Sequence, residues 1–266
     1  MTLKIVLAGA RGRMGSAAIE AIQKIEDMEI VAALDYKNDG LFLHEDKVHD
    51  TEIGIPIFTS FDRLVKETQP DVLLDLTTPD VVYENMYNAI KNGIRPVVGT
   101  SGLSFEEIEK LTEFANEQGI GGIIAPNFSI GAVLMMKFSA MAARYLEDIE
   151  IIESHHNQKV DAPSGTAMKT AEMIMNVRES HIQGHEDEKE HLAGARGADI
   201  EGMKIHSIRL PGLLAHQEVL LGADGELLTL RHDSFNRSCF MPGILMAIRN
   251  VLERKDLVYG LENILD

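Results

Sequence analysis

The sequence predicts an α/β protein with a doubly wound parallel sheet, followed by a second, α+β domain with a mixed or antiparallel sheet. In the first half, strand-like apolar runs and helical patterns alternate five times within about 125 residues. Such alternation is typical of parallel sheets. After Phe128, several strand candidates follow one another without helices between them. A length of 266 residues suits two domains of ordinary size.

The first elements come in the order strand, glycine turn, helix, strand and acid. Leu3–Ala8 is a continuous apolar run that ends at Gly9, and Glu29–Leu34 is a second run that ends at Asp35. Between them, small and apolar residues recur at steps of three and four, which places them on one face of a helix. These residues are Met14, Ala17, Ala18, Ala21, Ile22 and Ile25.

The same alternation continues through the first half. The further strands expected here are Asp71–Leu76, Arg95–Gly99 and Gly121–Ala125. A helix is expected over Asp80–Asn92, with Gly93 as its stop. Ser104, with Glu107 three residues later, predicts a capping box at the start of another helix. Residues 36–69 are less regular, and their elements cannot be assigned from the sequence.

The second half mixes helices with successive strands. The expected helices are Ile130–Tyr145, Thr166–Val177 and Gly243–Glu253. The expected strands are Asp148–Glu153, Lys204–Leu210, Gln217–Leu221 and Leu227–His232. The segment Ser180–Gly202 is charged and interrupted by glycines, so we expect a long mobile loop or lid there.

The charge balance and cysteine content limit the partners. The net charge is −17, and such a chain repels polyanions, so we expect neither nucleic acid nor a membrane surface as partner. The single cysteine, Cys239, allows no internal disulfide and suits a reducing, cytoplasmic location. The apolar start at Leu3 has no basic region before it, so it predicts a strand and not a signal peptide. A small molecule is the expected partner.

A glycine loop follows the first strand with the spacing G-x-x-G-x-x-G. The helix start behind it offers free N–H groups to a phosphate, and Asp35 lies where an acid can bind a ribose hydroxyl. This arrangement indicates a Rossmann-like domain that binds a nicotinamide dinucleotide. The alternative is a plain glycine turn with a solvated acid. The candidate residues in the loop are Gly9, Ala10, Arg11, Gly12, Arg13 and Met14.

The residues beside Asp35 bear on the choice between NADH and NADPH. A carboxylate disfavours the 2′-phosphate of NADPH, while a neighbouring cation offsets that effect. Tyr36 is neutral, and Lys37 or Arg11 could supply the cation. We expect NADH to be at least as good a cofactor as NADPH.

Two further loops follow expected parallel strands. The carboxyl ends of such strands line the ligand crevice of an open α/β sheet, so both loops are cofactor-binding candidates. The alternative is ordinary loop chemistry. Their residues are Gly99, Thr100, Ser101, Ala125, Pro126, Asn127 and Phe128.

The segment Glu153–Ala167 concentrates the chemistry of the second half. His155, His156 and Lys159 stand close together in sequence, just before a helix that Ser164 can cap. The first-turn N–H groups of that helix, at Gly165 and Thr166, form an end that binds a carboxylate. Hydride addition to a conjugated C=C–C=N system leaves a carbon that must be protonated, which a lysine or an imidazolium can do. The segment therefore predicts a reductase acting on a small dicarboxylate.

The alternatives for paired histidines are a metal site and an ordinary solvated turn, and we expect no metal. Adjacent residues on a strand point apart, and no nearby cysteine or well-spaced carboxylates complete a ligand set for His155 and His156. A second group of histidines, His181, His185 and His191, falls in the glycine-rich segment and is expected to be a solvated part of the lid.

Several segments resemble one enzyme family. ESHHNQKVDAPSGTA, residues 153–167, resembles the signature of 4-hydroxy-tetrahydrodipicolinate reductase, also called dihydrodipicolinate reductase, of the diaminopimelate–lysine pathway. GARGRMG resembles that family's nucleotide loop, and DLTTP, PVVGTSG and APNFSIG resemble its further cofactor loops. The resemblance runs in order from Leu3 to about Gly260.

The resemblance implies a reaction and a set of roles. The substrate would be (2S,4S)-4-hydroxy-2,3,4,5-tetrahydrodipicolinate, reduced to tetrahydrodipicolinate with loss of water. His155 matches the family's proton donor and acceptor, and Lys159 its proton donor, although either could deliver the proton. His156, Gly165 and Thr166 match substrate contacts. The glycine loop, Asp35 and the two later loops match cofactor contacts.

The resemblance also implies an assembly and a domain division. The family is typically a homotetramer that associates through the sheet of the second domain, and its final helix returns to the first. We therefore expect a dinucleotide-binding domain at 1–127 and 241–266, and a substrate-binding and oligomerisation domain at 128–240. Some members carry arginine where this chain has Tyr36, so the cofactor remains NADH or NADPH.

Two other functions fit parts of the pattern. One is another two-domain dehydrogenase of a small carboxylate; an aldehyde-oxidising type needs a cysteine in the site, and Cys239 lies outside every cofactor motif. The other is a dinucleotide sensor without catalysis, for which the sequence offers no helix-turn-helix candidate.

Overall fold

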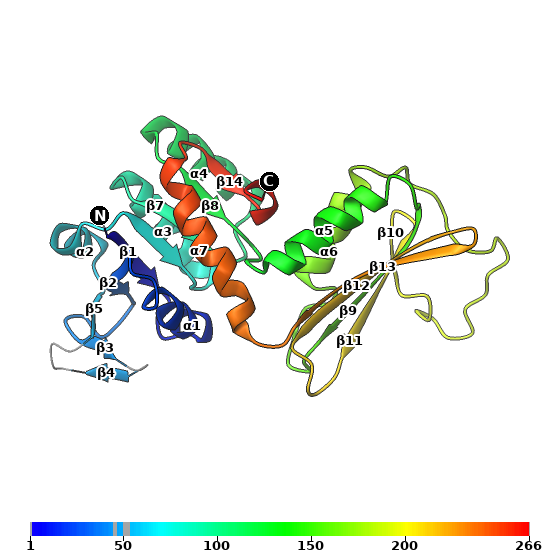
Figure 1. The fold of residues 1–266 in the computed structure, drawn as a ribbon, viewed down its shortest axis with the longest axis horizontal. Coiled ribbons are helices and arrows are strands. Elements are labelled where there is room, and N and C mark those ends of the chain that lie inside the picture. Colours follow the sequence, from blue (N-terminus) through cyan, green and yellow to red (C-terminus); the bar gives the residue numbers. More distant parts are fainter. Residues whose placement is uncertain (1, 45–46, 50–53, 266) are drawn as a thin grey trace. The chain divides into compact units, whose positions relative to one another are not determined.

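The computed structural model describes residues 2–44, 47–49 and 54–265. The chain forms two compact units (Figure 1). Unit 1 comprises Met1–Phe128 and Phe240–Asp266, and unit 2 comprises Ser129–Cys239. The predicted fold class is confirmed: a largely parallel α/β sheet in unit 1, and a smaller mixed sheet with two helices in unit 2.

Unit 1 is built on a sheet whose strand order, over the described residues, is β14-β8-β7-β6-β1-β2-β5-β3-β4. The pairs from β14 to β5 are parallel, and only β3 pairs antiparallel with its neighbours. The order reverses direction at β1, which is the pattern of a doubly wound sheet. The strands are β1 (Leu3–Ala8), β2 (Met28–Leu34), β3 (Phe42–His44), β4 (Lys47–His49), β5 (Ile55–Phe58), β6 (Val72–Asp75), β7 (Arg95–Val98), β8 (Gly122–Ile124) and β14 (Leu257–Tyr259).

Helices cover both faces of this sheet. In β1, Val6 and Ala8 belong to the apolar cluster that includes Leu64 and Ala89 of two helices, while Ile5 and Leu7 on the opposite face are fully buried as well. A strand buried on both faces reads as a continuous apolar run, which is why β1 and β6 were predictable. The helices are α1 (Arg13–Ile22), α2 (Phe61–Thr68), α3 (Pro79–Lys91), α4 (Phe105–Gln118) and α7 (Met241–Asn250).

Local signals set several helix ends. The predicted capping box is present at α4, where the Ser104 hydroxyl accepts from the Glu107 N–H and the Glu107 carboxylate accepts from the Ser104 N–H. Helix α7 ends at Asn250, and a 3₁₀ turn, Val251–Glu253, completes the expected helix. Arg249 of α7 donates twice to Asp27, just before β2, at 2.8 and 2.9 Å.

The segment 36–69 contains structure that the sequence did not predict. Strands β3, β4 and β5 and helix α2 lie in it, apart from residues 45–46 and 50–53, which are outside the described part. These strands are three or four residues long, too short for a hydrophobic period to show.

Unit 2 is a mixed sheet covered by two helices. Its strand order is β10-β11-β9-β12-β13, in which β11 runs parallel to β9 and the other pairs are antiparallel. Helices α5 (Ile130–Ala142) and α6 (Gly165–Met175) pack against each other and against the sheet (Figure 1). The strands are β9 (Asp148–His155), β10 (Ala198–Ile200), β11 (Met203–Arg209), β12 (Ala215–Ala223) and β13 (Glu226–Ser234).

The expected loop Ser180–Gly202 is only partly a loop. Its end forms β10, which pairs with β11, so the expectation of an unstructured segment up to Gly202 was wrong there. The segment is also tied to β9: Gln183 exchanges two hydrogen bonds with the backbone of Ile149, and Arg196 binds Glu150 at 2.7 Å. A strand of three residues depends on its partner for stability, which local sequence does not reveal.

In the described residues, no helix is long and apolar enough to cross a membrane.

Candidate active site

The glycine loop between β1 and α1 is tightly built. Gly9 has φ +82°, and a Cβ there would lie 2.4 Å from the Leu76 carbonyl oxygen. A Cβ at Gly15 would lie 2.3 Å from the Gly9 oxygen, so both positions need glycine for packing. Gly12, the N-cap of α1, has ordinary backbone angles, and no side chain of the described residues caps the helix there. The helix start is thus open to an anion.

Asp35, the acid at the end of β2, is paired with Arg11 of the glycine loop. Arg11 donates to both carboxylate oxygens, from Nε at 2.5 Å and from a terminal nitrogen at 2.9 Å. Burial raises the pKa of Asp35, but the hydrogen bonds and charge of Arg11 outweigh it and leave the pKa below its usual range. The structure therefore brings together two predicted cofactor residues, with the acid ionised.

Tyr36 lies between two cations beside this pair. The residue is 81% exposed, and the Arg11 guanidinium and the Lys37 ammonium lie 5.6 and 5.2 Å from its ring centroid. Arg11 and Lys37, the two cations that could bind a 2′-phosphate, therefore lie close to Asp35. An acid at this position binds the ribose in such domains.

A residue that the sequence did not single out organises the loops after β6 and β7. Asp75, the last residue of β6, is fully buried. It accepts from the N–H and hydroxyl of Thr77 at 3.0 and 2.6 Å and from the Thr100 hydroxyl at 2.7 Å. Asn85 of α3 donates to its other oxygen at 2.7 Å. The only local hint was an acid followed two residues later by a pair of threonines in DLTTP.

The loops after β7 and β8 pack together in unit 1. The ring of Phe128 fills the space that Gly99 leaves, since a Cβ at Gly99 would lie 2.7 Å from it. The side chains of Ala125 and Phe128 are buried, so the exposed surface of that loop is its backbone with Pro126 and Asn127.

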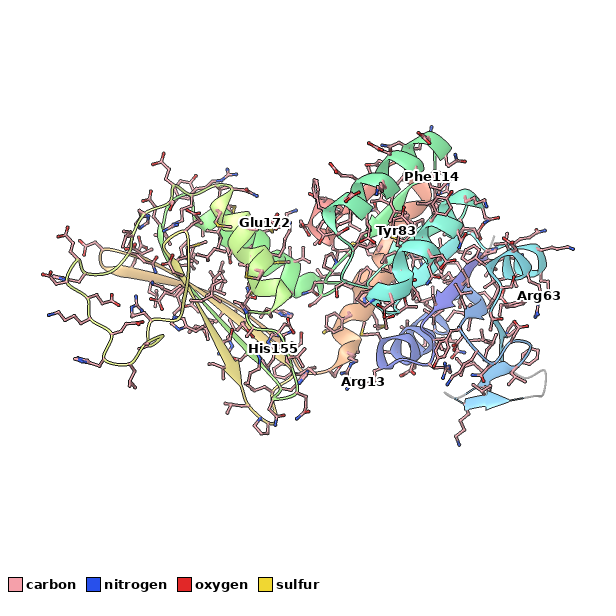
Figure 2. The ribbon with its side chains drawn as sticks, turned by 180° about the vertical axis from the view of Figure 1, so that it is seen from behind. Arg13, Arg63, Tyr83, Phe114, His155 and Glu172 are labelled. Atoms are coloured by element: carbon pink, nitrogen blue, oxygen red, sulfur yellow. The ribbon has the colours of Figure 1, made fainter. Side chains whose placement is uncertain are left out.

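In unit 2, His155 is the last residue of β9 (Figure 2). Glu153 lies two residues earlier and therefore on the same face of the strand. Its Oε2 lies 2.5 Å from His155 Nδ1. Burial lowers the pKa of His155, as do the charges of Lys159 and Arg209, and Glu153 only partly opposes them. His155 is thus mainly neutral at pH 7.

Glu153 is fully buried and held by donors from three elements. Arg209, at the end of β11, donates to both oxygens at 2.8 and 2.7 Å. The N–H of Ser164, which caps α6, donates at 3.2 Å. Burial raises the pKa of Glu153, but hydrogen bonds with Arg209, the Ser207 side chain and His155 outweigh it and keep the carboxyl ionised. Sequence reasoning missed this pair because Arg209 is 56 residues away.

Lys159 lies in the loop that follows β9. Its ammonium donates to both oxygens of Asp161 at 2.8 Å, and Asp161 was not predicted as a partner. The hydrogen bond with Lys159 lowers the pKa of Asp161. The Arg209 side chain also donates to the Asp161 backbone oxygen at 2.8 Å, so the lysine loop is tied to the Glu153 site.

The start of α6 follows this loop. Ser164 caps the helix as expected, accepting from the Ala167 N–H at 3.2 Å. A Cβ at Gly165 would meet nothing within 4 Å, so packing does not require glycine there. The helix start is thus uncrowded, which suits a carboxylate ligand.

His181, outside this site, has structural partners. His181 bridges Asp148 at 2.8 Å and Arg178 at 3.1 Å, so it is anchored to β9 and not only solvated. Across the described residues, no group of three or more His, Cys, Asp or Glu side chains could hold a metal ion.

Comparisons with known proteins agree over the whole chain. The family model described as dihydrodipicolinate reductase, N-terminus, matches residues 3–128, and the model described as dihydrodipicolinate reductase, C-terminus, matches residues 131–265. The 4-hydroxy-tetrahydrodipicolinate reductase of Bacillus pumilus (strain SAFR-032) is 55% identical over 265 residues, covering 100% of this chain and 98% of that protein. That of Oceanobacillus iheyensis is 54% identical, with 100% of both chains covered.

A solved structure is similar as well. Dipicolinate-bound dihydrodipicolinate reductase from Paenisporosarcina sp. TG-14 superposes with a TM-score of 0.90 and 52% identity, covering 100% of both chains. Two family models together span nearly the whole chain, and relatives above 50% identity match it over their full length. The chain belongs to the dihydrodipicolinate reductase family.

Proposed function

We propose that this protein reduces (2S,4S)-4-hydroxy-2,3,4,5-tetrahydrodipicolinate to tetrahydrodipicolinate with loss of water, in lysine biosynthesis through diaminopimelate. The observation that carries the proposal is the full-length identity of 55% with a 4-hydroxy-tetrahydrodipicolinate reductase. The cluster of His155, Lys159 and the uncrowded start of α6 supports it, because it combines proton-transfer groups with a site for a carboxylate.

The proton-transfer groups are His155 and Lys159. The bound nicotinamide supplies a hydride, and the enamine carbon that results takes a proton from one of these two side chains. Lys159 carries transferable protons, and its position is fixed by Asp161. His155, mainly neutral, suits proton exchange near pH 7. His156 and the N–H groups of Gly165 and Thr166 hold the substrate carboxylates in this proposal.

The dinucleotide binds at the glycine loop and the neighbouring strand ends of unit 1. The open start of α1 binds the pyrophosphate, and Asp35 binds the adenosine ribose. The residues proposed to contact the cofactor are Gly9, Ala10, Arg11, Gly12, Arg13, Met14, Asp35, Gly99, Thr100, Ser101, Ala125, Pro126, Asn127 and Phe128.

Both NADH and NADPH fit the residues around Asp35. The ionised acid favours the ribose hydroxyl of NADH. Arg11 offsets that charge and, with Lys37, offers cations to a 2′-phosphate. We propose that the protein uses either cofactor, with NADH at least as good.

The assembly and location follow the family. We propose a cytoplasmic homotetramer that associates through the sheet of unit 2. Exposed apolar side chains on its strands, including Ile208 and Leu227, support this. Light scattering on the purified protein tests it: a tetramer mass is expected, and a monomer mass would contradict the proposal.

The reaction is tested by the loss of reduced-nicotinamide absorbance with enzymatically generated substrate. Oxidation of NADH, NADPH or both is expected, in proportion to the substrate added. If neither is oxidised although both bind, the sensor alternative is favoured. If oxidation instead requires a different small carboxylate, the chain is another dehydrogenase.

A further inference from the structure

Glu153 is the point where three parts of the unit 2 site meet. Its carboxylate is fully buried and binds His155 from its own strand, Arg209 from β11 and the N–H of Ser164 at the start of α6. Removal of a charged group from water is unfavourable unless that group is paired and hydrogen-bonded. The chain therefore keeps this carboxylate in a place where it fixes the surrounding groups.

The contact with His155 selects a tautomer. An ionised carboxylate has only acceptor atoms, so the proton of the neutral imidazole lies on Nδ1 and is donated to Oε2 of Glu153. Nε2 then has its lone pair free, and no described residue hydrogen-bonds it. A carboxylate that orients a histidine in this way is a known device for proton transfer.

Arg209 extends the same arrangement to the lysine loop. One guanidinium nitrogen donates both to Glu153 and to the backbone oxygen of Asp161. The Asp161 carboxylate in turn holds the ammonium of Lys159. The two proton-transfer candidates are therefore positioned by one ion pair, in which Glu153 is buried and Arg209 is partly buried.

We infer that Glu153, held by Arg209, is a positioning residue that fixes the Nδ1–H tautomer of His155, leaves Nε2 for proton transfer, and anchors the Lys159 loop. This inference rests on the proposed function, since it assigns Glu153 a part in the same reaction. Neither residue touches the substrate in this scheme, and both act through His155 and Lys159.

The charged groups facing His155 are Glu153, Lys159 and Arg209. Burial and the two cations lower the pKa of His155, and the negative charge of Glu153 opposes them. Loss of that negative charge therefore lowers the pKa of His155 further. The limb of the pH–rate profile that His155 sets should move to lower pH, whichever protonation state the reaction requires.

The main test compares Glu153→Gln with Glu150→Gln in the full-length, assembled protein. Glu150 is a matched control, because it lies on β9 too and binds an arginine and a histidine, Arg196 at 2.7 Å and His206 at 2.9 Å. For Glu153→Gln we expect kcat to fall by about 10²-fold, within the contribution of a positioned proton-transfer group. The KM for the cofactor should stay unchanged, and the pH limb should move to lower pH. Glu150→Gln should match the unaltered enzyme.

Glu153→Asp distinguishes the effect of the negative charge from the effect of side-chain length. It keeps the negative charge but shortens the side chain, so the pH limb should return towards its original position while kcat stays reduced. An unchanged kcat and pH profile in Glu153→Gln, or the same changes in Glu150→Gln, would overturn the inference.

A measurement on the unaltered protein covers the case in which Glu153→Gln does not fold. Long-range ¹H–¹⁵N NMR spectra report which ring nitrogen of His155 carries the proton, with the signal assigned by its loss in His155→Asn. A proton on Nδ1 is expected, and a proton on Nε2 would overturn the inference. This result does not depend on turnover, so it stays informative even if the proposed reaction fails.

Discussion

Asp75 of unit 1 and Glu153 of unit 2 are both fully buried carboxylates on strands in the middle of their sheets. Asp75 is satisfied by neutral donors from Thr77, Thr100 and Asn85. Glu153 is satisfied by two ionisable side chains, Arg209 and His155, together with the Ser207 side chain and one backbone N–H. The neutral donors around Asp75 fix the shape of the loops after β6 and β7. The arginine and the histidine around Glu153 instead connect its charge to the groups proposed to transfer the proton.

The comparison predicts that changes in the two regions alter different kinetic constants. Changes around Glu153 should lower kcat and leave cofactor affinity intact. Changes around Asp75 and the glycine loop should weaken cofactor binding and leave the chemical step intact at saturation.

The largest effect is expected for Lys159→Ala. Loss of a positioned proton donor should lower kcat by about 10²–10⁴-fold. The dissociation constant of the cofactor, measured by fluorescence titration, should barely change, because Lys159 lies in unit 2. A collapse of cofactor binding would show that Lys159 was assigned to the wrong function.

Gly12→Val should remove cofactor affinity while the fold survives. Gly12 has φ −81°, which any residue adopts, and a Cβ would meet the Gly9 oxygen at a tight but tolerable 3.2 Å. The larger side chain would block the approach of a pyrophosphate, and each lost hydrogen bond to a charged group costs about 1.5–3 kcal/mol. Circular dichroism serves as the folding control. Retained affinity for NADH would contradict the phosphate-loop assignment.

Asp75→Asn sharpens the comparison, since it replaces one acceptor oxygen by a donor within nearly the same volume. A buried donor or acceptor left unsatisfied costs about 1–3 kcal/mol. We therefore expect a lower Tm and cofactor affinity weaker by about 10-fold, with kcat nearly unchanged at saturating cofactor. A shifted pH profile with normal affinity would break the distinction between the two carboxylates.

Arg11→Ala should change cofactor choice. Without Arg11, the charge of Asp35 is no longer offset, and a 2′-phosphate loses a cation. We expect kcat/KM for NADPH to fall by about 10-fold, the equivalent of one charge-assisted hydrogen bond, and kcat/KM for NADH to change less. Equal losses for both cofactors would mean that Arg11 does not distinguish them.

The smallest effect is on stability against pH. The pKa of His155 is lowered in the folded protein, so unfolding takes up a proton between that value and the ordinary value of about 6.5. Stability should fall with decreasing pH through this window, by at most about 1.4 kcal/mol per pH unit for one proton. In His155→Asn the decline of Tm should be shallower. An identical decline would place the effect elsewhere, for instance at His232, whose pKa burial also lowers.

Local patterns predicted the elements that are set locally. The apolar run of β1, the glycine turn and the capping box of α4 each leave a signal within a few consecutive residues, and they were correct. Strand β10 and strands β3 to β5 were missed because they are short and depend on pairing with distant segments.

The residues of the candidate site likewise divide into those that local sequence predicted and those that it did not. His155, Lys159 and the capped start of α6 were visible because they lie within one segment. Asp75 and the pair of Glu153 with Arg209 were not, since their partners come from separate elements. One signal was present for Glu153: it continues the buried face of Ile149 and Ile151 on β9, where an acid needs a partner.

The transfer of deuterium from cofactor to product is the most direct test of the proposed hydride-transfer reaction. NADH or NADPH deuterated at the hydride-donating position is incubated with the protein and the enzymatically generated substrate, and the product is analysed by mass spectrometry. We expect tetrahydrodipicolinate that carries one deuterium at carbon, formed in step with cofactor oxidation. Unlabelled product, or cofactor oxidation without tetrahydrodipicolinate, would contradict it.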